Sequence, residues 1–213
     1  MRSKAVSVYA VTNSRTVPDA PGLRPVRVGN LTALVANARR APAPTAANLR
    51  RYHETIAAIA AVLPAVLPVR FATIMTEPEL VLVLRARAKS LTETLRRVRG
   101  GVQMTLRLAG VPQRQDAGAI RPPAGRARSG LDYLRQRAAR ERDVPGFEAV
   151  RSALDAWIVE ERVERKGEVV SVYHLIRRQA AAAYGRAATA ALARAGLRGV
   201  VSGPFPPYAF SAL

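Results

Sequence analysis

The stretch at residues 66–73 constrains the fold more than any other, because long amphipathic patterns flank it on both sides and neither can run through it. Pro64 and Pro68 lack the backbone N–H that a helix needs. Each proline also disfavours helical conformation in the residue before it. The sequence therefore predicts a short, buried, extended segment between two helices.

Three short strands are predicted ahead of the first helix, at residues 5–11, 25–28 and 31–35. β-branched and aromatic residues fill the first of them. Gly29-Asn30 separates the other two by a two-residue spacing that is typical of a tight hairpin turn.

Two long helices are predicted on either side of the extended segment. Thr45 is a good N-cap for the first, whose apolar residues recur at steps of three and four from Leu49 to Leu63. Thr76 and Glu79 have the spacing of a capping box, and the apolar stripe that follows predicts one continuous helix to Val98.

The second half of the chain predicts strand, helix in two pieces, strand, strand, helix, strand. The segments are a strand at 102–108, helices near 131–138 and 147–157, a hairpin of 158–165 with 168–176 turning at Lys166-Gly167, a helix at 177–195 and a strand at 198–202. A basic loop without apolar periodicity is expected at 110–128. This order is the split βαβ pattern of ferredoxin-like folds.

The fold class expected from these elements is α+β, with two small domains of which the second is ferredoxin-like. We expect the domains at residues 1–100 and 101–203. A C-terminal arm rich in proline and aromatic residues follows at 204–213.

The formal net charge of +19 favours an anionic partner such as nucleic acid, an acidic membrane face or an acidic protein. A genome rich in G and C, which supplies Arg and Ala together, explains the charge equally well. The sequence contains no cysteine, which fits a reducing cytoplasm. The longest apolar run, at 56–69, is shorter than a membrane-spanning helix and is interrupted by prolines, so we expect no membrane insertion.

No pattern in the sequence indicates catalysis, a cofactor or a metal. The chain lacks a glycine-rich phosphate loop, and His53 and His174, its only histidines, do not have the spacing of a helical zinc site. We interpret both as packed or surface histidines. Tyr173 is the one strand aromatic that could stack on a nucleic acid base, and cross-strand packing is the simpler interpretation.

The tail at 204–210 combines three prolines with aromatic anchors, so we expect it to pack along a surface. It is either a clamp on the chain's own core or a docking strip for a partner. Arg70 lies between apolar Val69 and Phe71, so its side chain should emerge on the opposite face. If that face is covered, a carboxylate or the carbonyls of the tail should bind the guanidinium, and we predict a structural role.

The chain resembles the GvpL/GvpF family of gas-vesicle accessory proteins along almost its whole length. The tail from Ser202 to Phe210 and the Leu-Pro-x-Arg-Phe-x-Thr motif from Leu67 to Thr73 are the most specific matches. Supporting matches are Val8-Tyr9-Ala10, the segment from Gly29 to Val35, His53, the strand start from Gly101 to Met104, and Tyr133-Leu134. Val69 and Ala72 depart from the family pattern, in which Met and Gly are usual.

The resemblance implies a non-enzymatic role in gas vesicle assembly, namely binding the small hydrophobic shell protein and preventing its aggregation during nucleation. It implies a location in the cytoplasm and at the gas vesicle, with the shell protein and other gas vesicle accessory proteins as partners. A basic nucleic-acid-binding module is the alternative. The residues expected to bind the partner or to support the fold are Arg70, Phe71, Pro204, Phe205, Pro207, Tyr208 and Phe210.

Overall fold

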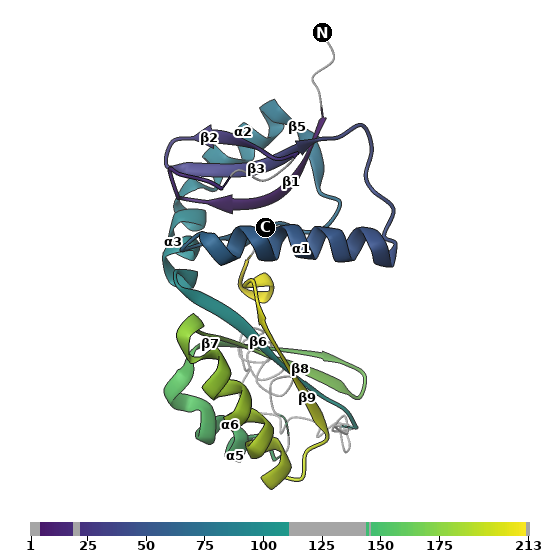
Figure 1. The fold of residues 1–213 in the computed structure, drawn as a ribbon, viewed down its shortest axis with the longest axis vertical. Coiled ribbons are helices and arrows are strands. Elements are labelled where there is room, and N and C mark those ends of the chain that lie inside the picture. The colour runs from purple at the N-terminus through teal and green to yellow at the C-terminus, as the bar shows by residue number, and fades with distance from the viewer. Residues whose placement is uncertain (1–4, 19–21, 111–143, 145, 212–213) are drawn as a thin grey trace, which may run out of the picture. The chain divides into compact units, whose positions relative to one another are not determined.

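A computed structural model of the chain describes residues 5–18, 22–110, 144 and 146–211 (Figure 1). The chain divides into two compact units, which are described separately here. Unit 1 comprises residues 1–103 and 204–213, and unit 2 comprises residues 104–203. The part of the predicted basic loop at 111–128 and the helix predicted near 131–138 lie outside the described residues.

The sheet of unit 1 confirms the predicted strands and their hairpin. Its order is β2 (Arg24–Val28), β3 (Leu31–Asn37), β1 (Ala5–Thr12) and β4 (Leu67–Pro68), and β5 (Ile74–Thr76) also pairs with β1. Gly29 has a φ of 59°, as the tight turn between β2 and β3 requires. The register of β1 against β3 shifts at Tyr9, which is the extra residue of a β-bulge.

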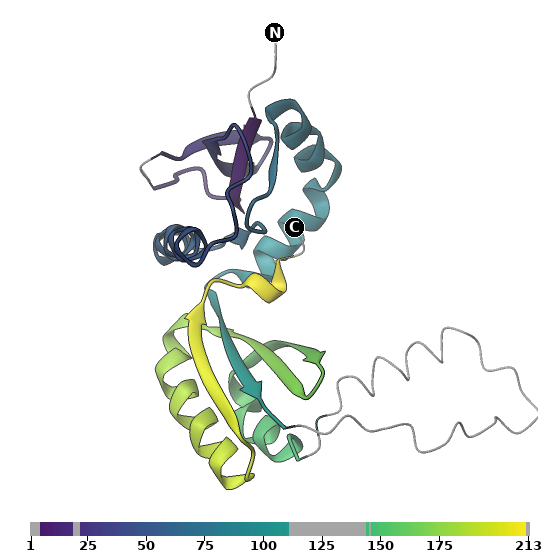
Figure 2. The same cartoon turned by 90° about the vertical axis from the view of Figure 1, so that its right-hand side faces the viewer.

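Helices cover both faces of this sheet, with α1 (Ala46–Val62) on one side and α2 (Glu77–Ala86) and α3 (Ala88–Val98) on the other (Figure 2). The predicted caps are confirmed. The Thr45 side chain accepts a hydrogen bond from the Asn48 N–H, and Thr76 and Glu79 form the reciprocal capping box. None of the described helices is long and apolar enough to cross a membrane.

The prediction of one continuous helix up to Val98 is wrong, because the chain breaks at Arg87. This residue has φ −105° and ψ 12°, outside helical geometry, and separates α2 from α3. Leu84 and Leu91, on either side of the break, are both buried. Seven residues are about two helical turns, so Leu84 and Leu91 fit the apolar stripe of one continuous helix. The apolar periodicity therefore gave no sign of the break.

The extended segment at 66–73 is shorter than predicted. Only Leu67–Pro68 pairs as a strand, and the chain then turns before β5, a strand that the sequence did not indicate. Thr73 closes the turn by donating its backbone N–H and its side-chain hydroxyl to the carbonyl of Arg70, at 3.2 and 2.8 Å. Within this turn Ala72 has a φ of 63°, in the left-handed region that glycine favours.

Unit 2 contains a four-stranded sheet with α5 (Glu148–Leu154) and α6 (Ala181–Arg194), and thus an α+β architecture, as predicted for both halves of the chain. Its strands are β6 (Gly101–Leu108), β7 (Ile158–Lys166), β8 (Val169–Arg177) and β9 (Gly199–Phe205), in the order β7-β8-β6-β9. The last strand therefore lies beside the first. The ferredoxin-like description of this unit stays a prediction, since much of the connection from β6 to β7 lies outside the described residues.

Three local predictions for unit 2 need correction. Lys166 pairs with Val169, so the turn between β7 and β8 is made by Gly167-Glu168 and not by Lys166-Gly167. Trp157 lies in a short 3-10 helix after α5 and not in α5 itself. Strand β9 continues to Phe205, because the proline within it lies in a strand at the edge of the sheet, where a missing N–H is tolerated.

Candidate functional site

Unit 1 gathers most of its aromatic side chains where the C-terminal tail meets α1 and β1. Phe71 and Tyr208 pack against the apolar cluster around Ile56, although they lie far apart in sequence. Two of the predicted tail aromatics and the aromatic of the 66–73 motif thus belong to one group of rings. We call this group the aromatic tail cluster; it consists of Tyr9, Tyr52, His53, Phe71, Phe205 and Tyr208.

Tyr52 connects the inner half of the cluster. Its ring centroid lies 4.9 Å from that of Tyr9 and 5.3 Å from that of Phe71, which it meets edge-on. Its hydroxyl donates to the carbonyl oxygen of Val69, while the Val69 N–H donates to the Tyr9 carbonyl at 2.9 Å. Burial raises the pKa of Tyr52 above its ordinary value, so the hydroxyl remains a donor.

His53 and Tyr208 connect the outer half of the cluster. The His53 Nδ1 and the Tyr208 hydroxyl are joined by a hydrogen bond of 2.9 Å, and the Phe205 ring meets the imidazole edge-on at 5.8 Å. Burial raises the pKa of Tyr208 to about 12. The single histidine of α1 therefore binds the tail and does not face a ligand site.

The rest of the tail is held by burial and by backbone hydrogen bonds. Phe210 is fully buried, and Pro206 and Pro207 are buried as well. The Ala209 N–H donates at 2.7 Å to the side-chain oxygen of Gln103, which is itself buried. The expected packing of the tail along a surface is confirmed, and Pro204, which is exposed, begins the packed segment.

Arg70 does not have the environment that we expected. Its side chain is exposed, and no hydrogen bond joins its guanidinium to the tail among the residues that the structure describes. The alternation was right, since Val69 is buried and Phe71 half-buried. The face to which Arg70 points is not covered, however, so solvent replaces the protein partner that a buried charge would need.

The aromatic tail cluster also leaves an apolar edge open to solvent. Phe205 and Tyr208 are half-buried, and Leu49, one helical turn before His53 on α1, is 43% exposed. Such an arrangement contains no nucleophile or general base in a cleft. What it offers a partner is aromatic and aliphatic contact.

Unit 2 contains a buried polar network that the sequence analysis did not predict. His174 on β8 is fully buried, and both of its ring nitrogens are engaged: Nδ1 with the Tyr184 hydroxyl at 2.5 Å and Nε2 with a Glu161 oxygen at 2.9 Å. Arg151 on α5 donates to both carboxylate oxygens of Glu161. The network therefore ties β7, β8, α5 and α6 together.

The charge of Glu161 is stabilised by its partners. Burial by itself would raise the pKa of this carboxyl, but hydrogen bonds from His174 and Arg151, together with their charges, lower it to about 2. Burial raises the pKa of Tyr184. With both imidazole nitrogens occupied and the ring shielded from solvent, His174 has no free atom with which to act on a substrate.

One signal in the sequence could have revealed this network. Once the β7–β8 hairpin turn is placed, Glu161 falls directly opposite His174. No group of three or more His, Cys, Asp or Glu side chains that could hold a metal occurs within the described part of the chain.

Tyr173 occupies the cross-strand position that the simpler interpretation predicted. It is half-buried, lies opposite Arg162 in the hairpin, and donates its hydroxyl to Glu164 at 3.1 Å. Its hydroxyl is thus engaged by a neighbouring strand residue, in agreement with cross-strand packing.

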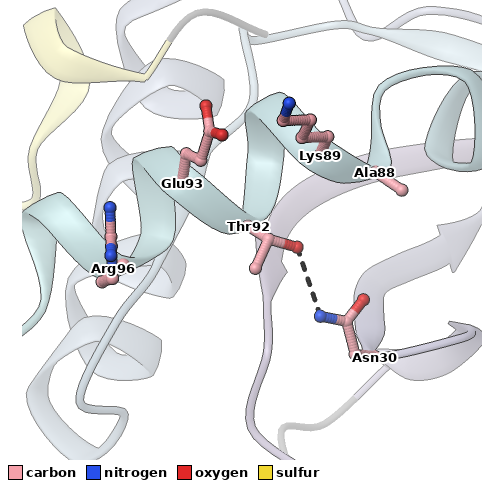
Figure 3. Close-up of a pocket in the computed structure, with 6 residues that line it drawn as sticks. All are labelled: Asn30, Ala88, Lys89, Thr92, Glu93 and Arg96. Atoms are coloured by element: carbon pink, nitrogen blue, oxygen red, sulfur yellow. Dashed lines mark hydrogen bonds between the residues drawn. The ribbon is translucent and has the colours of Figure 1, made fainter.

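A shallow depression lies between α3 and the β2–β3 turn of unit 1 (Figure 3). Thr92 accepts a hydrogen bond from the Asn30 side-chain amide at 3.2 Å, and Lys89, Glu93 and Arg96 line the helical side. The charges alternate along one helix face at spacings that favour mutual attraction. They leave no convergent, buried polar group to define a ligand.

Comparison with known proteins identifies the family. The family model described as "Gas vesicle synthesis protein GvpL/GvpF" matches residues 5–212. The chain belongs to the GvpL/GvpF family. No curated protein sequence matches it significantly.

Two solved structures share the fold of this GvpL/GvpF protein over its whole length. The gas vesicle protein GvpF from Anabaena sp. PCC7120 has a TM-score of 0.70 and 13% sequence identity, with 99% of each chain covered. GvpF from Microcystis aeruginosa has a TM-score of 0.73 and 15% identity, with 99% of this chain and 100% of the other covered. The family places the chain among gas vesicle accessory proteins.

Proposed function

We propose that this GvpL/GvpF protein is a non-enzymatic assembly factor that binds the small hydrophobic shell protein of gas vesicles and prevents its aggregation while the shell nucleates. It acts in the cytoplasm and at the growing vesicle, together with other gas vesicle accessory proteins. The observation that carries the proposal is the family match over residues 5–212.

The physical reason for such a factor is the apolar surface of an unassembled shell subunit. Exposed apolar patches and unpaired strand edges aggregate unless a partner covers them until assembly. A protein with this role needs apolar contact surface and no catalytic group. The partly exposed edge of the aromatic tail cluster, with Leu49, Phe205 and Tyr208, is one such surface.

The charge of the chain supports its solubility in this role. A net charge of +19 opposes self-association, so a complex with an apolar subunit would stay in solution. Charge also creates the main competing explanation for any binding, namely non-specific attraction to an acidic partner or to nucleic acid.

Co-expression with the shell protein tests the proposal. We expect more shell protein in the soluble fraction and a complex that co-purifies, and crosslinking with mass spectrometry would then map its contacts. A shell protein that is no more soluble with this chain than without it would refute the proposal.

Ionic strength separates apolar binding from charge-driven binding. Apolar contact survives high salt, whereas attraction to phosphates weakens steeply as counterions return. Capture of the shell protein should therefore persist from about 50 mM to about 200 mM salt, a range over which several phosphate contacts lose about 10³-fold or more in affinity. An unrelated protein of similar size and net charge is the control.

A further inference from the structure

The described sheets end in edge strands that differ in how well they are protected. An edge strand presents a row of unpaired backbone N–H and C=O groups, which is a template for another strand. Natural proteins blunt such edges with charges, prolines, bulges or very short strands. In unit 1 the edges are β2 and the short β4 and β5, and in unit 2 they are β7 and β9.

Four of these edge strands carry the usual protection. Strand β2 contains Arg24, Pro25 and Arg27 within five residues, and β4 and β5 are two and three residues long. Strand β7 has six charged residues among nine, and its register shifts at Val159, where a bulge interrupts pairing. Each device opposes the addition of a further strand.

Strand β9 is different. Its seven residues, Gly-Val-Val-Ser-Gly-Pro-Phe, include no charge, although the chain as a whole is 23% charged, and its one proline, Pro204, lies near its end and leaves residues 199–203 without such protection. Val200 is 66% exposed, a larger exposed fraction than that of the other large apolar side chains in the described residues. Gly199 and Gly203 are exposed as well, so little side chain shields the backbone of this edge.

The orientation of the β9 backbone follows from its contact with the end of β6. The Ala109 N–H donates to the carbonyl of Arg198 at 3.0 Å, so the backbone groups of Arg198 face β6. Alternation along the strand then directs the backbone groups of Gly199 and Val201 to the outer side, as far as Gly203, whose φ of 118° interrupts the regular strand. A Cβ on Gly199 would meet Leu192 of α6 at 3.3 Å, so the next residue, Val200, projects from the opposite face.

We propose that the outer edge of β9 binds an extended, uncharged segment of the gas vesicle shell protein as an added strand. This inference rests on the function proposed above and assigns it a surface. Only an extended chain can match backbone donors and acceptors at strand spacing, which is the β-augmentation mode of recognition. The exposed Val200 and the absence of charge favour an apolar segment, because its side chains gain apolar contact with Val200 while a charged segment finds no opposite charge to attract it.

Two substitutions test the edge without disturbing the core. Val200→Lys places the residue that protects natural edges at a site that is already exposed. Val201→Pro removes an outward N–H while keeping an apolar ring, and proline is tolerated where the N–H faces away from the sheet. Val159→Lys, on the protected edge β7, is the matched control, since Val159 is 48% exposed. Circular dichroism and the melting temperature of each variant confirm that it folds.

The readout is capture of purified shell protein by the immobilised full chain. We expect Val200→Lys and Val201→Pro to weaken capture by about tenfold or more, and Val159→Lys to bind like the wild type. In the complex, the amide hydrogens of Gly199 and Val201 should exchange more slowly, while exchange in β7 stays unchanged.

The possible failures are distinguishable. Capture that is equal for the wild type and all three variants overturns the assignment to β9 and leaves the proposed function standing. No capture by the wild type overturns both. A dimer of this chain that the β9 variants abolish, while capture of the shell protein is unchanged, shows that a second copy occupies the edge and also overturns the assignment.

Discussion

Removing the methyl group of Ala72 tests whether the turn at 70–73 holds a strained backbone conformation. Its φ of 63° places it in the left-handed region, the only such non-glycine residue in the described part of the chain. The turn is imposed from outside: Val69 and Thr73, on its two sides, are hydrogen-bonded to β1 through the Tyr9 carbonyl and the Val8 N–H. The substitution Ala72→Gly should therefore relieve strain without altering the turn.

The expected gain is the difference between opposing terms. Left-handed conformation costs an L-residue such as alanine about 1 to 2 kcal/mol. Glycine offsets about 0.5 to 1 kcal/mol of this gain, because it makes the unfolded chain more flexible and so favours unfolding. Removing a half-buried methyl group costs about 0.4 kcal/mol more. With the middle of each range, we expect Ala72→Gly to stabilise unit 1 by about 0.35 kcal/mol.

Ala58→Gly is the matched control, because it makes the same chemical change in the exposed middle of α1. There glycine should destabilise unit 1 by about 1 kcal/mol. Urea unfolding of unit 1 can be monitored by hydrogen exchange and mass spectrometry, with peptides from β1 reporting the unfolding midpoint of each variant. With a urea dependence of about 2 kcal/mol/M, the midpoints should shift by about +0.2 M for Ala72→Gly and about −0.5 M for Ala58→Gly.

The direction and size of the shift in the urea midpoint show whether the backbone at Ala72 is strained. If Ala72→Gly lowers the midpoint by about 0.5 M, as Ala58→Gly should, the left-handed conformation at Ala72 stores no strain and the reasoning is refuted.

Three further predictions concern the two units. The Glu161 pKa of about 2 lies below its unfolded value, so this carboxylate contributes about 2 kcal/mol of stability above about pH 4.5 and loses it as the pH falls towards 2. Urea unfolding followed by Trp157 fluorescence should show lower stability at pH 3 than at pH 7. The variant Glu161→Gln should show a weaker dependence of stability on pH. Phe210→Ala should destabilise unit 1 by about 3 to 5 kcal/mol, because the ring is fully buried, and a melting temperature within a degree of wild type would contradict a structural tail. Arg70→Ala should change the free energy of unfolding by less than about 0.5 kcal/mol, since the side chain is exposed, and a larger loss would reveal a partner for the guanidinium.

Local signals in the sequence predicted the elements well. Caps at Thr45 and Thr76, the glycine of the β2–β3 turn and the alternation in β6 act through neighbouring residues, so a short stretch of sequence contains all the information that they need. The break at Arg87 was not predicted, because the buried residues on its two sides keep the apolar spacing of one continuous helix. The turn at 70–73 was not predicted either. Hydrogen bonds to β1 create it, and alanine has no local preference for the left-handed conformation that Ala72 adopts.

The sequence by itself determined the α+β class, the presence of an anchored aromatic tail, and the order of the described helices and strands apart from β5 and the break at Arg87. Only the tertiary structure decided which side chains meet. It brought Tyr208 to His53, joined His174 to Tyr184 and Glu161, and left Arg70 in solvent. It also decided that β9, and not β7, is the uncharged edge of its sheet. The physical reason is that contacts between distant residues depend on how whole elements pack, whereas periodicity and capping report only on the element in which they occur.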